Sequence, residues 1–260
     1  MARTHQKKGL FPRRAIGLVA LAAMFAIVGM APLALAEDAG DSADEGFFVD
    51  GDARQDFIER IIGLAEEKFR EARGKPQKAA SGSDIYVCKN FTVYLFRENR
   101  GDFRMAAYPD VPLVIPDNQE KDDCKPYVYG LEWKDIPAEQ GNPFYAAASF
   151  RYDDKLSKAD NKKIARAFMM QAQRGDYFQM AADYYYGKGA HSLVITADYD
   201  EETDTILWTD SNMKGEKIGG VRHGYVQFDA EKKIDWFVDA FCHKKHGATL
   251  YRLRDDIIYN

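Results

Sequence analysis

Residues suited to covalent catalysis occur in order along this chain: a cysteine, Cys88, a histidine, His191, and a carboxylate close to an amide, Asp210 and Asn212. A thiolate is a strong nucleophile, and an imidazole can take and return its proton. A third polar group fixes the tautomer and orientation of the imidazole. If the fold brings these side chains together, they predict acyl chemistry through a thioester.

Cys88 is expected near the start of a helix. Ser83 or Asp84 can cap a helix that ends near Asn99 and holds Phe91 on its buried side. Unpaired N–H groups and the dipole at a helix start favour a thiolate over a thiol. The alternative is that Cys88 is a small buried hydrophobic residue or half of a disulfide.

His191 stands at the start of an expected strand, where its imidazole could face that helix. His223 is a weaker candidate for the base. Asp210 and Asn212 follow one hairpin later and, being two residues apart on a strand, point to the same side. They could equally be turn residues at a strand end.

Helices are expected in the first half of the chain. Apolar residues recur at three and four residues from Asp52 until Gly74 and Pro76 end the pattern. Another helix follows at Ser157, which has capping-box spacing to Asp160. Its expected inner face consists of Ile164, Phe168 and Ala172.

After Gly175 the periodicity becomes that of strands. They are expected at residues 177–180, 192–197, 205–209, 225–228 and 249–253, with a short helix at 234–241. Helices followed by an antiparallel meander predict the α+β class, with N-terminal helices packed on an antiparallel sheet.

The N-terminal region is expected to be an export signal, residues 1–36. It contains five basic residues, an apolar stretch over 15–30, and Ala-Leu-Ala at 34–36. An uncleaved membrane anchor is the alternative. Residues 37–51 are predicted to be a flexible acidic leader, and 52–260 a single domain with a Pro-rich insertion at about 108–152.

Charge and cysteine content narrow the function classes. The chain has 36 Lys plus Arg and 41 Asp plus Glu; five of the basic residues and none of the acidic ones lie in residues 1–36, so the remainder has 31 against 41, a net charge of −10. This acidity argues against a nucleic-acid partner. The three cysteines are an odd number for an exported protein, so one disulfide would leave one thiol.

Four segments together resemble the papain-like superfamily of secreted cell-wall hydrolases of the NlpC and CHAP types. Residues 87–96 (VCKNFTVYLF) resemble the nucleophile helix, and residues 174–178 (RGDYF) the Gly-Asp turn that opens the sheet. Residues 191–195 (HSLVI) resemble the strand of the base, and residues 210–212 (DSN) the acidic residue and Asn of the CHAP type. The resemblance covers about residues 52–228.

The resemblance implies a papain-like domain in which Cys88 is the nucleophile, His191 the base, and Asp210 or Asn212 orients it. The oxyanion would be bound by the backbone N–H of Cys88, with Gln77 or Tyr86 as further candidates. No cofactor or metal is required. If Cys88 stays reduced, Cys124 and Cys242 are left to form a disulfide.

The implied function is a secreted hydrolase of the bacterial cell envelope that cleaves amide bonds of peptidoglycan or of a wall-derived peptide. Two alternatives remain open. One is a non-catalytic papain-like scaffold that binds a wall fragment or an exported protein. The other is a cysteine peptidase or transferase that acts on secreted proteins. The oligomeric state is left open.

Overall fold

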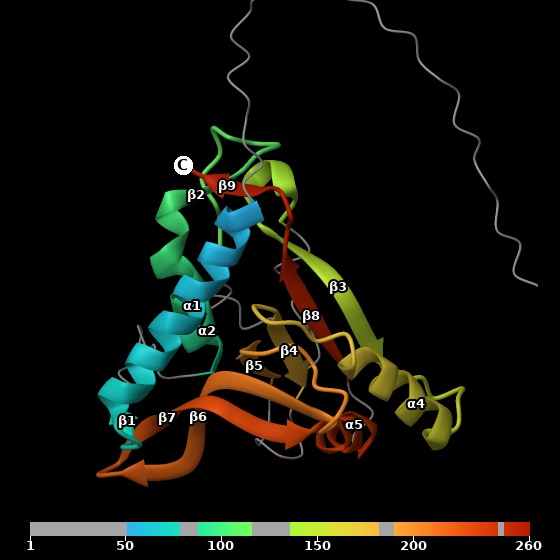
Figure 1. The fold of residues 1–260 in the computed structure, drawn as a ribbon. Coiled ribbons are helices and arrows are strands. Elements are labelled where there is room, and N and C mark those ends of the chain that lie inside the picture. Colours follow the sequence, from blue (N-terminus) through green and yellow to red (C-terminus); the bar gives the residue numbers. More distant parts are fainter. Residues whose placement is uncertain (1–50, 79–87, 116–135, 182–189, 244–246) are drawn as a thin grey trace, which may run out of the picture. The chain divides into compact units, whose positions relative to one another are not determined.

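A seven-stranded antiparallel sheet is the centre of the structure (Figure 1). The computed structural model describes residues 51–78, 88–115, 136–181, 190–243 and 247–260. The strands in spatial order are β1 (Gln77–Lys78), β7 (Val221–Lys233), β6 (Thr205–Ile218), β5 (Ala190–Ile195), β4 (Tyr177–Ala181), β8 (Gly247–Leu253) and β3 (Phe144–Arg151). A separate pair consists of β2 (Phe103–Met105) and β9 (Ile257–Tyr259).

Four α-helices are present among the described residues: α1 (Gly51–Ala72), α2 (Cys88–Asn99), α4 (Lys158–Met169) and α5 (Ile234–His243). Two 3₁₀ turns, η1 (Arg100–Asp102) and η2 (Ala138–Gln140), complete the elements. Helices combined with an antiparallel sheet confirm the expected α+β class.

The two faces of the sheet bury separate cores. Alternation along β4 sends Tyr177 into a core shared with α1 and α2, and Phe178 into a core shared with α4 and α5. On the first face, the Phe96 ring of α2 meets the Tyr177 ring edge-on at 6.2 Å. Helices therefore cover both faces of the sheet, with α1 and α2 on one and α4 and α5 on the other (Figure 1).

The predicted helices are found with small changes at their ends. In α4, the Ser157 hydroxyl accepts the Asp160 N–H at 3.1 Å and donates to the Asp160 carboxylate at 2.6 Å. The expected inner face of this helix is wrong at Ile164, which is 47% exposed, whereas Phe168 is buried. Met169 is buried as well.

The strands are longer and more numerous than the sequence pattern indicates. β6 and β7 extend the predicted strands at 205–209 and 225–228 through charged residues to a hairpin at Gly219 and Gly220. Both glycines have positive φ, 59° and 82°, as a type I′ turn requires. β3 was not predicted: it lies within the stretch expected as an insertion, yet it pairs with β8 and forms an edge of the sheet.

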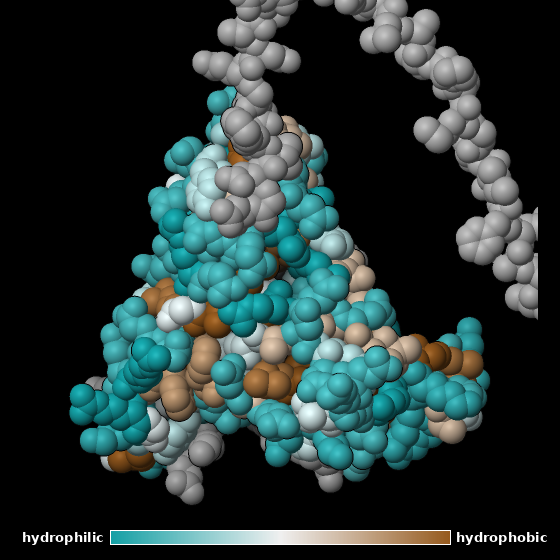
Figure 2. Space-filling view, in the orientation of Figure 1, coloured by the Kyte–Doolittle hydropathy of each residue, from teal (hydrophilic) through white to brown (hydrophobic). Residues whose placement is uncertain are grey.

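Several sequence-based expectations fall on residues outside the described ranges. These are the export signal or anchor, the acidic leader, the start of the helix before Cys88, and Cys124 with most of the Pro-rich stretch. No helix in the described ranges is long and apolar enough to cross a membrane. The described surface seen in Figure 2 is mainly hydrophilic, with hydrophobic side chains in scattered spots.

Candidate active site

Cys88 is the first residue of α2 and is half-buried. Its sulfur takes part in a hydrogen bond with the side chain of His191 and accepts two backbone N–H groups, those of Lys89 and Ser192. The Lys89 N–H belongs to the first turn of α2, where backbone donors have no partner within the helix. Backbone hydrogen-bond donors from both the helix and the sheet thus stabilise a negative charge on the sulfur.

The Ser192 N–H reaches the sulfur because the pairing of β5 with β6 ends early. The Ile195 N–H points towards β4, where it donates to the Asp176 carbonyl at 2.9 Å, and the Thr196 N–H points the other way, to the Leu207 carbonyl at 3.0 Å. N–H directions alternate along a strand, so the N–H of Ser192, four residues before Thr196, also points towards the β6 side. Pairing with β6 covers only residues 194 and 195 of β5, so the Ser192 N–H has no β6 partner.

The α2 helix packs against both β5 and β6, on the two sides of this opening. The Cys88 sulfur therefore occupies a position in the ladder that a β6 carbonyl would otherwise fill. A local break in strand pairing thus gives the sulfur its place beside the sheet.

His191 is held in place by a buried carboxylate. Its Nε2 lies 2.7 Å from Oδ2 of Asp210, and the two residues are 2% and 0% exposed. The other side of the imidazole is engaged with Cys88, as the hydrogen bond to the thiol requires. The three side chains therefore form a chain of contacts in the order thiol, imidazole, carboxylate.

Two further side chains fix Asp210, and sequence reasoning missed both. The Trp208 indole N–H donates to Oδ2 at 3.1 Å, and the Gln227 amide donates to Oδ1 at 2.9 Å. A register shift between Trp208 and Asp210 in the pairing of β6 with β7 accompanies this arrangement. Trp208 stands two residues from Asp210, a spacing that places both on one face of a strand, whereas no sequence pattern indicates Gln227.

The electrostatics of the site favour a thiolate and an imidazolium. Burial raises the pKa of the Cys88 thiol, but the hydrogen bond and charge of His191 and the two backbone N–H groups outweigh it, so the pKa lies below its ordinary value. Burial lowers the pKa of His191, and the contacts with Asp210 and Cys88 more than reverse this and raise it to about 10. Both shifts favour the thiolate–imidazolium form of the pair over the neutral form.

The remaining predicted site residues lie elsewhere or play other parts. Asn212 is inside β6 opposite Tyr225, and within the described residues the carboxylate on the imidazole is that of Asp210. Asp210 and Asn212 are strand residues, not turn residues at a strand end. The rival base His223 lies on β7, where its Nδ1 is 2.9 Å from the Val221 carbonyl.

The candidate oxyanion donors are only partly described. The Gln77 amide donates to the carbonyls of Ala72 and Lys75 near the end of α1, so its N–H groups are engaged there. Tyr86 lies outside the described residues. The backbone N–H of Cys88 remains the candidate that the position of the sulfur favours.

The Gly-Asp turn before β4 is a structural anchor. Gly175 has a φ of 86°, and a Cβ added to it would lie 2.7 Å from Cγ1 of Ile58. The Asp176 carboxylate, buried in the fold, takes two hydrogen bonds from Arg252, each 2.8 Å long. Burial raises the pKa of Asp176 despite this ion pair. Through these contacts the turn holds β4 against α1 and β8, and its role is structural.

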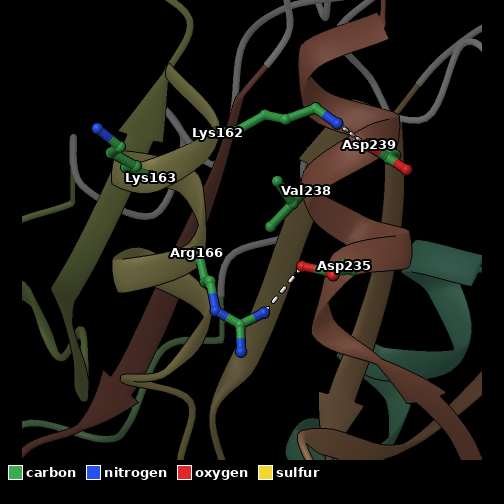
Figure 3. A pocket seen from close by; sticks show the side chains of 6 residues that line it. All are labelled: Lys162, Lys163, Arg166, Asp235, Val238 and Asp239. Carbon is green, nitrogen blue, oxygen red and sulfur yellow. Dashed lines mark hydrogen bonds and ion pairs between the residues drawn. The ribbon is translucent and has the colours of Figure 1, made fainter. Parts of the chain in front are cut away.

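A hollow of about 240 Å³ between α4 and α5 is lined mainly by charged side chains (Figure 3). Arg166 bonds Asp235 at 2.8 Å, and Lys162 bonds Asp239 at 2.5 Å. Because these charges neutralise one another at an exposed surface, the hollow is an ion-pair network between two helices. Among the residues that the structure describes, no group of three or more His, Cys, Asp or Glu side chains is placed to hold a metal ion.

The cysteines are described at two of the three positions. Cys88 and Cys242 are both thiols, and Cys242 is buried on the inner side of α5, where burial raises its pKa. Cys124 lies outside the described residues, so the pairing of Cys124 with Cys242 stays a prediction. Comparison of the whole chain with family models, with curated proteins and with solved structures finds no match.

Proposed function

We propose that this protein is a cysteine-dependent amidohydrolase or peptidase of papain-like type, with Cys88 as nucleophile, His191 as acid and base, and Asp210 as the residue that orients His191. The observation that carries the proposal is a single buried imidazole in contact with both a thiol at a helix start and a buried carboxylate. Nucleophile, base and orienting group in contact are what thiol-based acyl transfer requires.

In the proposed reaction, the Cys88 thiolate attacks an amide carbonyl carbon and forms a C–S bond. The imidazolium of His191 gives its proton to the leaving amine as the C–N bond breaks, which leaves a thioester. Neutral His191 then takes a proton from water, whose oxygen attacks the thioester and releases the acid. The proton stays on His191, so the thiolate and imidazolium are restored.

Peptidoglycan is the substrate we propose, because the four segments that resemble cell-wall hydrolases include all three of these residues. The proposed location is the bacterial cell envelope, outside the cytoplasm. A non-catalytic scaffold would be favoured by a His191 distant from Cys88, and the contact between them counts against it. Action on secreted proteins, by a peptidase or a transferase, uses the same site and differs only in substrate.

The test is the pH dependence of alkylation by iodoacetamide, followed at each cysteine by mass spectrometry. We expect Cys88 to be labelled rapidly well below the ordinary thiol pKa of about 8.5, and this advantage to vanish in His191→Ala. The buried thiol of Cys242 is an internal control, because its pKa is raised. Labelling of Cys88 only above pH 8.5, unchanged by the substitution, would refute the proposal.

A second experiment identifies the substrate class from the cleavage products. The protein and its Cys88→Ala variant are incubated with peptidoglycan and, separately, with an unfolded polypeptide, and new amino groups are located by mass spectrometry. Release from peptidoglycan alone supports the wall substrate, whereas cleavage of the polypeptide alone supports the peptidase alternative.

A further inference from the structure

A hollow of about 230 Å³, here called the β3 hollow, lies at the start of the edge strand β3. Its lining is mainly apolar and aromatic and includes Ile136, Pro137 and Tyr145, and its one charged side chain is that of Arg254. Tyr145 is 37% exposed, and Ala146, which also lines the hollow, is exposed as well. The β3 hollow is therefore open to solvent.

The loop that leads into β3 forms one part of this lining and is fixed by Asn142. This side chain is 2% exposed. Its carboxamide donates to the Ile136 carbonyl at 2.7 Å and accepts the Phe144 N–H at 3.0 Å. Because Asn142 is engaged in these internal contacts, Arg254 is the side chain in the β3 hollow suited to a charged ligand.

The Arg254 guanidinium is a donor in search of an acceptor. Its Nε is buried and has no hydrogen-bond partner among the residues that the structure describes. The two carboxylates that follow it in the chain lie near other groups: Asp255 is 3.5 Å from Nε of Arg54, and Asp256 is 3.5 Å from the backbone nitrogen of Ala107. A buried charged donor without an acceptor is unfavourable, and the planar fork of a guanidinium matches a carboxylate. The β3 hollow is thus suited to a carboxylate with an apolar body.

The edge of β3 beside the hollow offers backbone hydrogen-bonding groups. The Arg254 N–H donates to the Pro143 carbonyl at 2.9 Å, so residue 143 faces β8. These directions alternate along a strand, and the pairing with β8 stays regular as far as Ala146, whose N–H and carbonyl therefore point to the outer side of β3. A strand added antiparallel to β3 would have its carboxyl end beside the start of β3, where Arg254 lies.

We propose that the β3 hollow binds the carboxyl terminus of a peptide that extends along the edge of β3 as an added antiparallel strand. The terminal carboxylate is bound by Arg254, the last side chain lies in the hollow, and the peptide backbone pairs with Ala146. A volume of about 230 Å³ is below the range of about 300–1,000 Å³ typical of pockets for whole small molecules, and suits a single terminal residue.

This peptide site is separate from the proposed active site. β3 is three strands away from β5, which carries His191. At about 4.8 Å between neighbouring strands, the two sites are about 14 Å apart across the sheet. The inference therefore does not depend on the thiol chemistry and can be tested without the nucleophile.

The test is a nuclear magnetic resonance titration of ¹⁵N-labelled Cys88→Ala protein with acetyl-tri-alanyl-leucine, as the free acid and as the carboxyl-terminal amide. The substitution of Cys88 prevents cleavage of the probe. We expect the acid to bind about tenfold or more tightly than the amide, and to shift the N–H resonance of Ala146. Equal affinity of acid and amide, or no binding of the acid at millimolar concentration, would overturn the proposal.

Arg254→Gln, made in the same background, should remove this preference. The acid should lose about tenfold in affinity, while the amide should change little. Arg151→Gln is the matched control, because Arg151 is an exposed residue at the other end of the same strand. If both substitutions weaken binding of the acid alike, general charge attraction explains the binding and the proposal fails.

Acetate distinguishes a peptide site from a simple anion site. It carries the carboxylate without a backbone that could pair with β3, so it should bind more weakly than the peptide acid and leave the Ala146 resonance in place. If acetate binds as tightly as the peptide acid, the β3 hollow is an anion site only, and the added strand is ruled out.

Discussion

The ionisation of Cys88 and His191 is a balance between burial and contact. Burial alone would leave a neutral thiol beside a neutral imidazole, because both charged forms lose hydration. The contact between the two groups, together with Asp210 at the imidazole and the two backbone N–H groups at the sulfur, reverses that outcome. The charged pair therefore depends in part on groups that take no part in bond formation.

Asp210→Asn tests that dependence. The amide keeps the size of the side chain but removes the negative charge beside His191, so the pKa of His191 should fall and that of Cys88 should rise. Alkylation of Cys88 at pH 6 should slow by roughly 10²-fold or more, with a smaller loss at pH 9. An unchanged pH profile would contradict the role given to Asp210. Glu201→Gln, at an exposed turn, is the control.

The pH dependence of stability follows from the same two groups. The raised pKa of His191 contributes stability that is complete below about pH 6.5 and is lost as the pH rises through about 10. The lowered pKa of Cys88 contributes stability that is complete above about pH 8.5 and is lost as the pH falls through its folded value.

Together, the two contributions predict a specific profile. Above about pH 8.5 the contribution of Cys88 is complete while that of His191 is still being lost, so between about 8.5 and 10 the free energy of unfolding contributed by the pair should fall. Urea unfolding of the protein, compared with a Cys88→Ser, His191→Gln double variant at pH 8.5 and 10, measures this fall. An energy difference between the two proteins that does not shrink at pH 10 would contradict the charged pair.

At the scale of elements, the turn before β4 sets the position of the strand that pairs with the base strand. Gly175 donates its N–H to the Ile195 carbonyl at 2.9 Å, and the pairing of β4 with β5 that follows places Met180 opposite His191. Gly175→Ala would force a Cβ against Ile58 and a strained positive φ. We expect a loss of about 2–4 kcal/mol in the free energy of unfolding.

Gly63→Ala is the matched control for that substitution. Gly63 is exposed within α1, and a Cβ added there meets no atom within 4 Å. This change should stabilise the protein by about 0.5–1 kcal/mol, since alanine favours a helix. Urea titrations of both variants measure the contrast, and a Gly175→Ala variant as stable as the parent would rule out the strain.

The cap of α4 predicts a small effect confined to its own helix. Ser157→Ala removes the acceptor of the Asp160 N–H and should cost about 1 kcal/mol. Alkylation of Cys88 should be unchanged, because α4 packs on the opposite face from α2. Thermal unfolding and the rate of Cys88 alkylation are measured on one sample. A lower unfolding temperature with an unchanged alkylation rate shows that the substitution affects α4 and not the site.

At the scale of the whole molecule, the C-terminal segment holds the described fold together. β9 pairs with β2, and Ile257 is completely buried in the core shared with α1 and α2. Ile257→Ala should cost about 2–5 kcal/mol, as for other large-to-small core changes. Ile218→Ala, at a side chain that is 48% exposed, should cost less than 1 kcal/mol. Equal losses in denaturant titrations would contradict this difference.

Local patterns in the sequence predict local structure well here. The apolar spacing of α1, the Ser157 cap and the alternation of β4 are all found because each depends on neighbours in the chain. β3 was missed, since its surroundings are rich in proline and its small alanines show no alternation. The parts of β6 and β7 next to their hairpin were missed because their charged residues break the alternation of apolar and polar side chains. Gly219-Gly220 nevertheless marks the turn between the two strands.

The site could be predicted only in part for a related reason. Residue types nominate Cys88, His191 and Asp210, but their contact depends on where the pairing of β5 with β6 stops, which no local pattern encodes. The same holds for Gln227, which reaches Asp210 across a strand register. Choosing Asp210 over Asn212 required the fold, since both lie on the same side of one strand.

The place of Cys88 beside the sheet has a spectroscopic consequence. The Ser192 N–H donates to sulfur rather than to a carbonyl, so its proton resonance should move as the sulfur gains or loses charge. A backbone amide on β5 is thus a built-in indicator of the protonation and alkylation of the thiol, readable in a ¹⁵N-labelled protein without any substrate. The sheet itself reports the state of the nucleophile.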